Sequence, residues 1–208
     1  MLSLSTSFLF FGAAVLLALA PGPDNIFVLT QAALRGKAAG LFVTLGLCTG
    51  LIVHTTAVAL GVAAIFQASM PAFNLLKTIG AAYLLYLAWQ AFHAGAASLA
   101  AGSSTELTPL RLYRRGIIMN VTNPKVSIFF LAFLPQFTDA SRGSIAVQMI
   151  LLGLLFILAT ILIFGGIALI AGTLGQWLGR SPKAQVIMNR IAGTIFAALA
   201  LRLATTNR

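Results

Sequence analysis

The stretch LALAPGPDNIF, Leu17–Phe27, decides how this chain is expected to fold. Sixteen mostly apolar residues precede it, yet two prolines, a glycine, an aspartate and an asparagine occupy the five positions 21–25. Proline lacks an amide hydrogen and its ring clashes with the preceding turn, so a helix breaks or kinks there. The apolar run resumes at Ile26. The pattern predicts one long apolar helix that is interrupted by a polar segment.

Composition indicates the class of protein. Of the 208 residues, 60% are hydrophobic and only 8% are charged, whereas soluble domains carry about 25% charged residues. Apolar runs long enough to cross a bilayer, about 20 residues each, recur along the chain. They do not alternate between polar and apolar residues as spanning strands would. We therefore predict an all-α integral membrane protein.

Six spanning helices are predicted, joined mostly by short loops. A longer connection, 94–112, is rich in Gly, Ser, Thr and Pro and reads as a flexible linker. It divides one transport domain into two three-helix halves, 1–93 and 113–208. The predicted spans cover about 4–31, 39–66, 71–93, 114–137, 145–172 and 185–204.

Basic residues indicate the orientation of the chain. Three alternate loops hold most of them, namely Arg35, Lys37, Arg111, Arg114, Arg115, Arg180, Lys183 and Arg190. Cytoplasmic loops are enriched in Lys and Arg, so these loops are predicted to be cytoplasmic and both termini to lie outside. The net charge of +10 is spread over loops and forms no soluble patch. Nucleic-acid binding is therefore not expected.

Asp24 lies deep in the first predicted span. An aspartate near a helix centre costs about 2.5 to 3.5 kcal/mol on insertion. Non-helical backbone at membrane depth is tolerated only where protein or a water-filled cavity covers it, so the break is expected to face inward. Asp24 is therefore a candidate substrate or coupling residue. The alternative is that it only caps the second half-helix, a role compatible with an anion and proton site at a helix start.

The second half of the chain contains the same kind of predicted helix break. The segment Asn120-Val-Thr-Asn123-Pro124-Lys125 places polar residues and a proline inside the fourth span. Each motif lies in the first helix of its half, and three spans per half make the halves opposite in orientation. This arrangement predicts an inverted-repeat transporter with its site near the bilayer midplane. The candidate residues at the two breaks are Pro21, Gly22, Pro23, Asp24, Asn25, Asn120, Asn123, Pro124 and Lys125.

Lys125 is a cation deep in the fourth predicted span, as Asp24 is an anion deep in the first. It lies eleven residues into the fourth span, which is about 16 Å deep and too far for easy snorkelling. Two unpaired charges would each be expensive at that depth, so Lys125 and Asp24 are expected to pair in the empty state. A zwitterionic substrate would offer each of them a substitute partner. Protonation of Asp24 from outside would then release the substrate and couple export to proton entry.

Two different roles are open for each of several other polar and aromatic residues. His54, near the middle of the second span, is suited to relaying protons or to bonding a neighbouring helix. Tyr83 shares a helix face with Tyr86 and Trp89, which could wall a cavity or form an interfacial belt. The Gly46–Gly50 pair is a GxxxG face, which favours close packing of two helices.

Taken together, the motifs resemble the LysE/RhtB family of amino-acid exporters, in order and spacing over nearly the whole chain. The resemblance implies export of an amino acid or small derivative across the inner membrane of a bacterium, powered by the proton gradient. The residues that carry it are Pro21-Gly22-Pro23, Gly36 with Gly40, Gly46 and Gly50, His54, the segment Gly80–Leu87, Asn120–Lys125 and Phe133-Leu-Pro135-Gln136-Phe137.

Competing functions have weaker support in the sequence. Export of divalent metal or other small cations is the alternative, although metal sites require clusters of His or carboxylates. Enzymatic activity and cofactors are not expected, because no nucleophile is clearly paired with a base. Neutral zwitterions are favoured as substrates because Asp24 is the only deep acid. The choice of amino acid and pairing into a homodimer are left open.

Overall fold

The computed structural model describes residues 2–68, 70–95 and 108–205, and every regular element in these ranges is helical. The middle of the predicted linker, residues 96–107, lies outside this description. The elements are α1 (Leu4–Leu19), α2 (Pro23–Arg35), α3 (Lys37–Ala68), α4 (Met70–His93), α5 (Pro109–Val121), α6 (Pro124–Ile128), the π-helix η1 (Phe129–Phe133), the 3-10 turns η2 (Leu134–Phe137) and η3 (Ala140–Arg142), α7 (Ile145–Arg180) and α8 (Pro182–Thr205).

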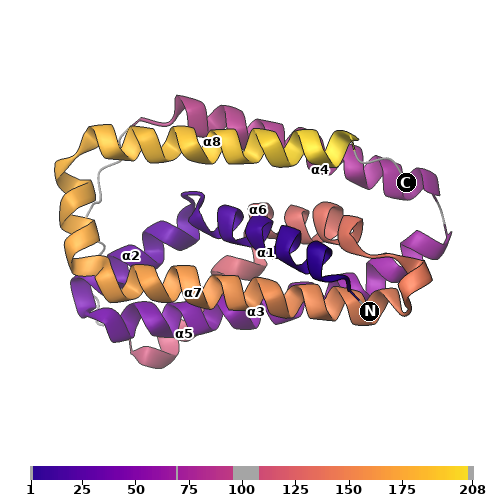
Figure 1. Cartoon of the computed structure of the whole chain (residues 1–208). Coiled ribbons are helices and arrows are strands. Elements are labelled where there is room, and N and C mark those ends of the chain that lie inside the picture. The colour runs from indigo at the N-terminus through magenta and orange to yellow at the C-terminus, as the bar shows by residue number, and fades with distance from the viewer. Residues whose placement is uncertain (1, 69, 96–107, 206–208) are drawn as a thin grey trace.

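The helices are arranged in layers (Figure 1). The pair α4 and α8 forms one side, and α3, α5 and α7 form the other. The half-helices α1 and α2, which flank the first break, and α6 with η1, which follow the second, lie between these layers. The start of α1 and the end of α8 lie toward the same end of the molecule (Figure 1). The two helix breaks are therefore surrounded by protein.

Several helices have the length and composition to cross a membrane. Among the described residues, Lys37–Gly61, Ile145–Gly175 and Pro182–Thr205 qualify singly. Two bent pairs qualify together: α1 with α2, bent by 62°, and Pro109–Val121 with Pro124–Phe137, bent by 50°. The all-helical membrane architecture is confirmed for this part of the chain. The count of six spans stays a prediction, since α4 does not meet the same criteria.

Local chemistry ends each half-helix where the sequence predicted a break. The chain turns extended at Ala20 and Gly22, and Pro23 becomes the first residue of α2. Proline is favoured there because its missing amide hydrogen has no helical partner to lose. In the second half Asn123 caps α6 and Pro124 is its first residue. Both predicted breaks are confirmed in position.

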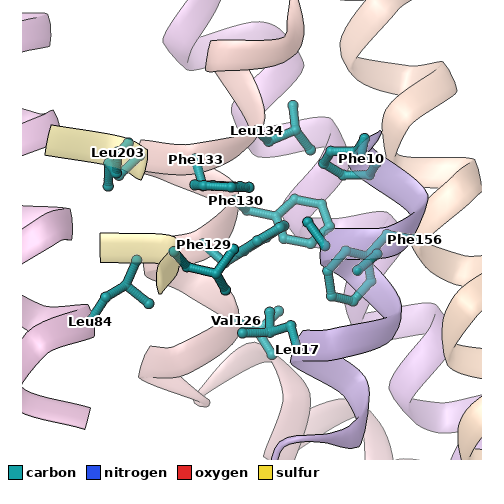
Figure 2. Packing of buried hydrophobic residues seen from close by; sticks show 14 of the residues in the cluster. Phe10, Leu17, Leu84, Val126, Phe129, Phe130, Phe133, Leu134, Phe156 and Leu203 are labelled. Carbon is teal, nitrogen blue, oxygen red and sulfur yellow. The ribbon is translucent and has the colours of Figure 1, made fainter. Parts of the chain in front are cut away.

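Two apolar clusters make up the core. The larger contains phenylalanine rings that contact one another in tilted and edge-on arrangements. They are Phe10, Phe129, Phe130, Phe133 and Phe156, which Figure 2 labels, and Phe137. The smaller lies around α2 and α3, with Val28, Val43, Leu47 and Phe164 among its members. Leu17 and Val126 lie at one edge of the larger cluster (Figure 2). The polar site described below lies between the clusters.

Glycines allow α3 and α5 to approach closely. A Cβ atom on Gly46 would collide with the Tyr113 carbonyl oxygen and would lie 2.9 Å from Gly116 Cα. A Cβ on Gly50 would lie 2.6 Å from the Asn120 side-chain oxygen. The GxxxG face therefore packs against α5, and Gly50 makes room for one of the predicted site residues.

Candidate functional site

The first break leaves backbone carbonyls of α1 without helical donors. The Leu17 carbonyl would normally accept from the amide four residues on, but that residue is Pro21 and carries no hydrogen. Lys125 Nζ takes the place of that donor, donating to Leu17 O at 3.3 Å and to Ala20 O at 3.1 Å. The ammonium passes so close to Gly22 that a Cβ there would lie 3.1 Å from Nζ. The negative end of α1 thus holds a cation from the other half of the chain.

Asp24 makes the reciprocal contact. Its Oδ2 accepts from Asn123 Nδ2 at 2.9 Å, while Asn123 Oδ1 accepts from the Lys125 amide at 3.0 Å. Asn25 Nδ2 donates to the Ala18 carbonyl at 2.7 Å, which satisfies another carbonyl that the break exposes. Asp24 therefore contacts the opposite break, and among the described residues its carboxylate accepts no hydrogen bond from its own helix.

His54 hydrogen-bonds a backbone carbonyl that the second break leaves without its helical donor. The Asn120 carbonyl lies four residues before Pro124, which has no amide hydrogen to donate. It accepts instead from the Asn123 amide at 3.1 Å and lies 3.1 Å from His54 Nε2. Because a carbonyl only accepts, Nε2 must carry the hydrogen. Of the two open readings of His54, the structure supports a hydrogen bond to a neighbouring helix.

A small cavity lies where the two breaks meet. Its volume is about 20 Å³, which is room for about one water molecule. Its apolar walls come from both core clusters: Leu17, Val126 and Phe156 from the larger, and Ala18, Leu47 and Phe164 from the smaller. Its polar lining is Asp24, Asn120, Lys125 and Thr160. The site therefore has apolar side chains from both core clusters around it.

Three oxygen atoms in this lining have no hydrogen-bond partner in the protein. They are Asp24 Oδ1, Asn120 Oδ1 and Thr160 Oγ1, and the three residues are only 3%, 3% and 2% exposed. Buried polar atoms without partners are rare and costly, and a functional role is one explanation for them. Thr160 was missed in the sequence, because one threonine in an apolar helix carries no local signal. Only its position beside the two breaks distinguishes it.

The expected ion pair between Asp24 and Lys125 is not formed. Among the described residues no ion pair joins their side chains, although both line the same cavity. The reason is that each group has another partner. The ammonium donates to the carbonyls at the end of α1, and Asp24 Oδ2 accepts from Asn123. Hydrogen bonds created by the helix breaks thus replace the direct charge pairing.

Tyr83 does not line this small cavity. It lies half-buried on α4 with its ring centroid 6.0 Å from that of Tyr86, and the cavity between the breaks is lined without it. Tyr86 and Trp89, farther along the same face, are 49% and 58% exposed. This exposure is consistent with an interfacial belt for the face they share.

A larger pocket of about 210 Å³ lies beside the first break. Pro21 and Asn25 line it, and Asn25 Oδ1 is buried without a hydrogen-bond partner. Its other lining residues are Leu19, Ile26, Leu29, Gly95, Ile167, Leu174, Gln185, Met188 and Asn189. The break between α1 and α2 therefore contacts two cavities, a small polar one and a larger apolar one.

The broken apolar helices and the polar site buried between them define a membrane translocator. Residues 15–207 match the family described as LysE type translocator, and the chain belongs to this family. No solved structure matches the chain significantly.

Curated relatives cover nearly the same length. The chain is 34% identical over 192 residues to an uncharacterized membrane protein of Vibrio cholerae, covering 92% of this chain and 93% of the relative. It is 33% identical to the homoserine/homoserine lactone efflux protein of Salmonella typhimurium, with 92% of each chain covered. It is 27% identical to the leucine efflux protein of Salmonella choleraesuis, covering 92% of this chain and 91% of the relative.

Proposed function

We propose that this protein exports a neutral amino acid or small derivative from the bacterial cytoplasm in exchange for protons. The names of the Salmonella relatives support the substrate class. The observation that carries the proposal is the polar site itself. Asp24 and Lys125, of opposite charge, each follow the proline that restarts a half-helix, and both line one small cavity.

The proposal includes an inverted repeat of two three-helix halves. Each half runs in the same order, a broken helix, a long helix and a final helix. The contacts are consistent with a two-fold relation. The long helices α3 and α7 pack together, α4 packs with α8, and α3 contacts α5 as α7 contacts α1. Pro23-Asp24 would then correspond to Pro124-Lys125, which explains why the charges meet near the middle.

Substrate binding would exchange partners at the two breaks. The ammonium of a zwitterion would approach Asp24, and its carboxylate would approach the Lys125 ammonium in place of the α1 carbonyls. The cavity of about 20 Å³ is too small for a whole amino acid, so the breaks must widen as substrate enters. In the predicted orientation, the phenylalanine cluster lies on the outer side and the larger pocket lies on the cytoplasmic side. Each would open in turn during alternating access.

Proton coupling would act through Asp24. A proton arriving from outside would neutralise the carboxylate, and the substrate ammonium would lose its charged partner and leave. After the substrate has left, the protonated carboxyl group of Asp24 would release its proton to the cytoplasm before the next cycle. The metal-ion alternative finds no support in the names of the relatives.

Export from cells tests the proposal. Cells loaded with leucine or homoserine through dipeptides should release them faster when they produce the protein. Asp24→Asn and Lys125→Met should each abolish gradient-driven release at equal protein level, while Asp24→Asn should retain exchange of substrate for substrate.

Two exposed charges provide matched controls. Asp139→Asn, next to a short 3-10 turn, and Lys183→Met, in the exposed first turn of α8, remove the same charges far from the breaks in sequence and should leave export unchanged. The Ser141 hydroxyl and amide both donate to Asp139 and hold the pKa of its carboxyl below the usual range, so this control removes a real negative charge. Normal export by Asp24→Asn with unchanged dependence on external pH would reject Asp24 as the coupling site and leave His54 as the next candidate.

A further inference from the structure

The hydroxyl of Thr160 differs from those of other buried threonines. Helical threonines usually donate to the carbonyl four residues back. Thr44 does so to Gly40 O at 2.9 Å, and Thr55 to Leu51 O at 2.7 Å. Thr160 is as deeply buried, at 2% exposed, yet its Oγ1 has no such partner and lines the small cavity. The hydroxyl is therefore available to a group that enters the cavity.

Thr160 is one of three such oxygens that come from separate helices. Asp24 belongs to α2, Asn120 to α5 and Thr160 to α7. Each contributes one oxygen atom without a partner to the same lining. The same lining holds the Lys125 ammonium, which balances the charge of Asp24 and is itself bonded to the Leu17 and Ala20 carbonyls. The three buried acceptors therefore form a site for a small group that has hydrogens to donate, and the one on the carboxylate favours a charged donor.

We propose that Asp24 Oδ1, Asn120 Oδ1 and Thr160 Oγ1 together bind the α-ammonium group of the transported amino acid. An ammonium group has three N–H donors, which equals the number of acceptors. The volume of about 20 Å³ suits a group the size of one water molecule. The inference rests on the proposed amino-acid export and adds Thr160 as a residue that selects for an α-amino group.

The same arrangement disfavours related compounds. An α-hydroxy acid has one O–H in place of three N–H donors, so it would leave acceptors unpaired. Sites built to bond a polar group reject analogues that lack it more strongly than apolar pockets reject size differences. The protein should therefore export leucine in preference to 2-hydroxy-4-methylpentanoate, and homoserine in preference to 2,4-dihydroxybutanoate.

The test compares Thr160→Val with Thr160→Ser, which keeps the hydroxyl. Thr44→Val is the matched control, because it makes the same change at a buried threonine that donates within its own helix. Export of leucine and homoserine is measured over a range of internal concentrations, together with export of the two hydroxy acids. Thr160→Val should raise the apparent KM for the amino acid by about ten- to a hundredfold, the size expected for losing one hydrogen bond to a charged group. Preference over the hydroxy acid should fall by a similar factor, while Thr160→Ser and Thr44→Val stay near wild type.

Several outcomes would overturn the inference. If wild type exports an amino acid and Thr160→Val changes neither KM nor the preference over the hydroxy acid, the ammonium site is wrong and the proposed function stands. If Thr160→Val instead changes a dependence on sodium, the cavity holds a metal cation. Failure of wild type to export any amino acid would reject both proposals. If the Thr160→Val protein is missing from the membrane, Thr160→Ala is measured in the same assay, and its KM and its preference over the hydroxy acid decide between these outcomes.

Discussion

Gly22→Ala should disrupt the hydrogen bonds that Lys125 donates to the end of α1. The backbone at Gly22 is extended, with φ −166°, so alanine is tolerated there and only the new Cβ matters. That Cβ would lie 3.1 Å from Lys125 Nζ, so the ammonium must move by a few tenths of an ångström. The hydrogen bond to Leu17 O is already 3.3 Å long, and such a shift would break it. One hydrogen bond of a charged group stabilises by about 1.5 to 3 kcal/mol.

This loss can be isolated by a double-mutant cycle. Gly22→Ala should lower stability by about 2 kcal/mol in the wild-type background, but by much less in Lys125→Met, where no ammonium meets the new methyl group. Gly12→Ala is the control within the same broken span, since its Cβ would have nothing within 4 Å. Unfolding of the purified protein in detergent and export from cells are measured in parallel. If Gly22→Ala lowers the free energy of unfolding equally in the wild-type and Lys125→Met backgrounds, the contact between Gly22 and Lys125 is refuted.

The remaining predictions concern topology, packing and His54. In a background without other cysteines, Ser141→Cys should react with an impermeant external thiol reagent and Ser181→Cys should not; the reverse labelling would overturn the orientation. Gly46→Val should prevent α3 from meeting α5 and lower the amount of folded protein, whereas Gly61→Val, where no atom lies within 4 Å of an added Cβ, should be tolerated; equal yields would contradict the packing. His54→Gln keeps a donor for its carbonyl partner in α5 and should retain export, while His54→Leu should reduce it; loss in both variants would favour a proton relay.

The comparison of prediction and structure is clearest at the breaks. Pro21, Pro23 and Pro124 predicted where the helices end, because a missing amide hydrogen is a local property of one residue. The partners of the exposed carbonyls were not predicted, since Lys125 contacts Leu17 from 108 positions away in the sequence. The expected direct pairing of Lys125 with Asp24 was wrong for the same reason. A sequence shows which groups need a partner, and the fold decides which groups reach one another.

The sequence by itself determined the class of the protein, its helical character and the two interruptions, and it predicts the depth of their charges. These features follow from composition and from the covalent chemistry of proline and glycine. Only the tertiary structure decided that Thr160 joins Asp24 and Asn120 at one cavity and that Tyr83 does not. The physical reason is that hydrogen bonding and closure of a cavity depend on distances between helices far apart in the chain, which no local pattern encodes.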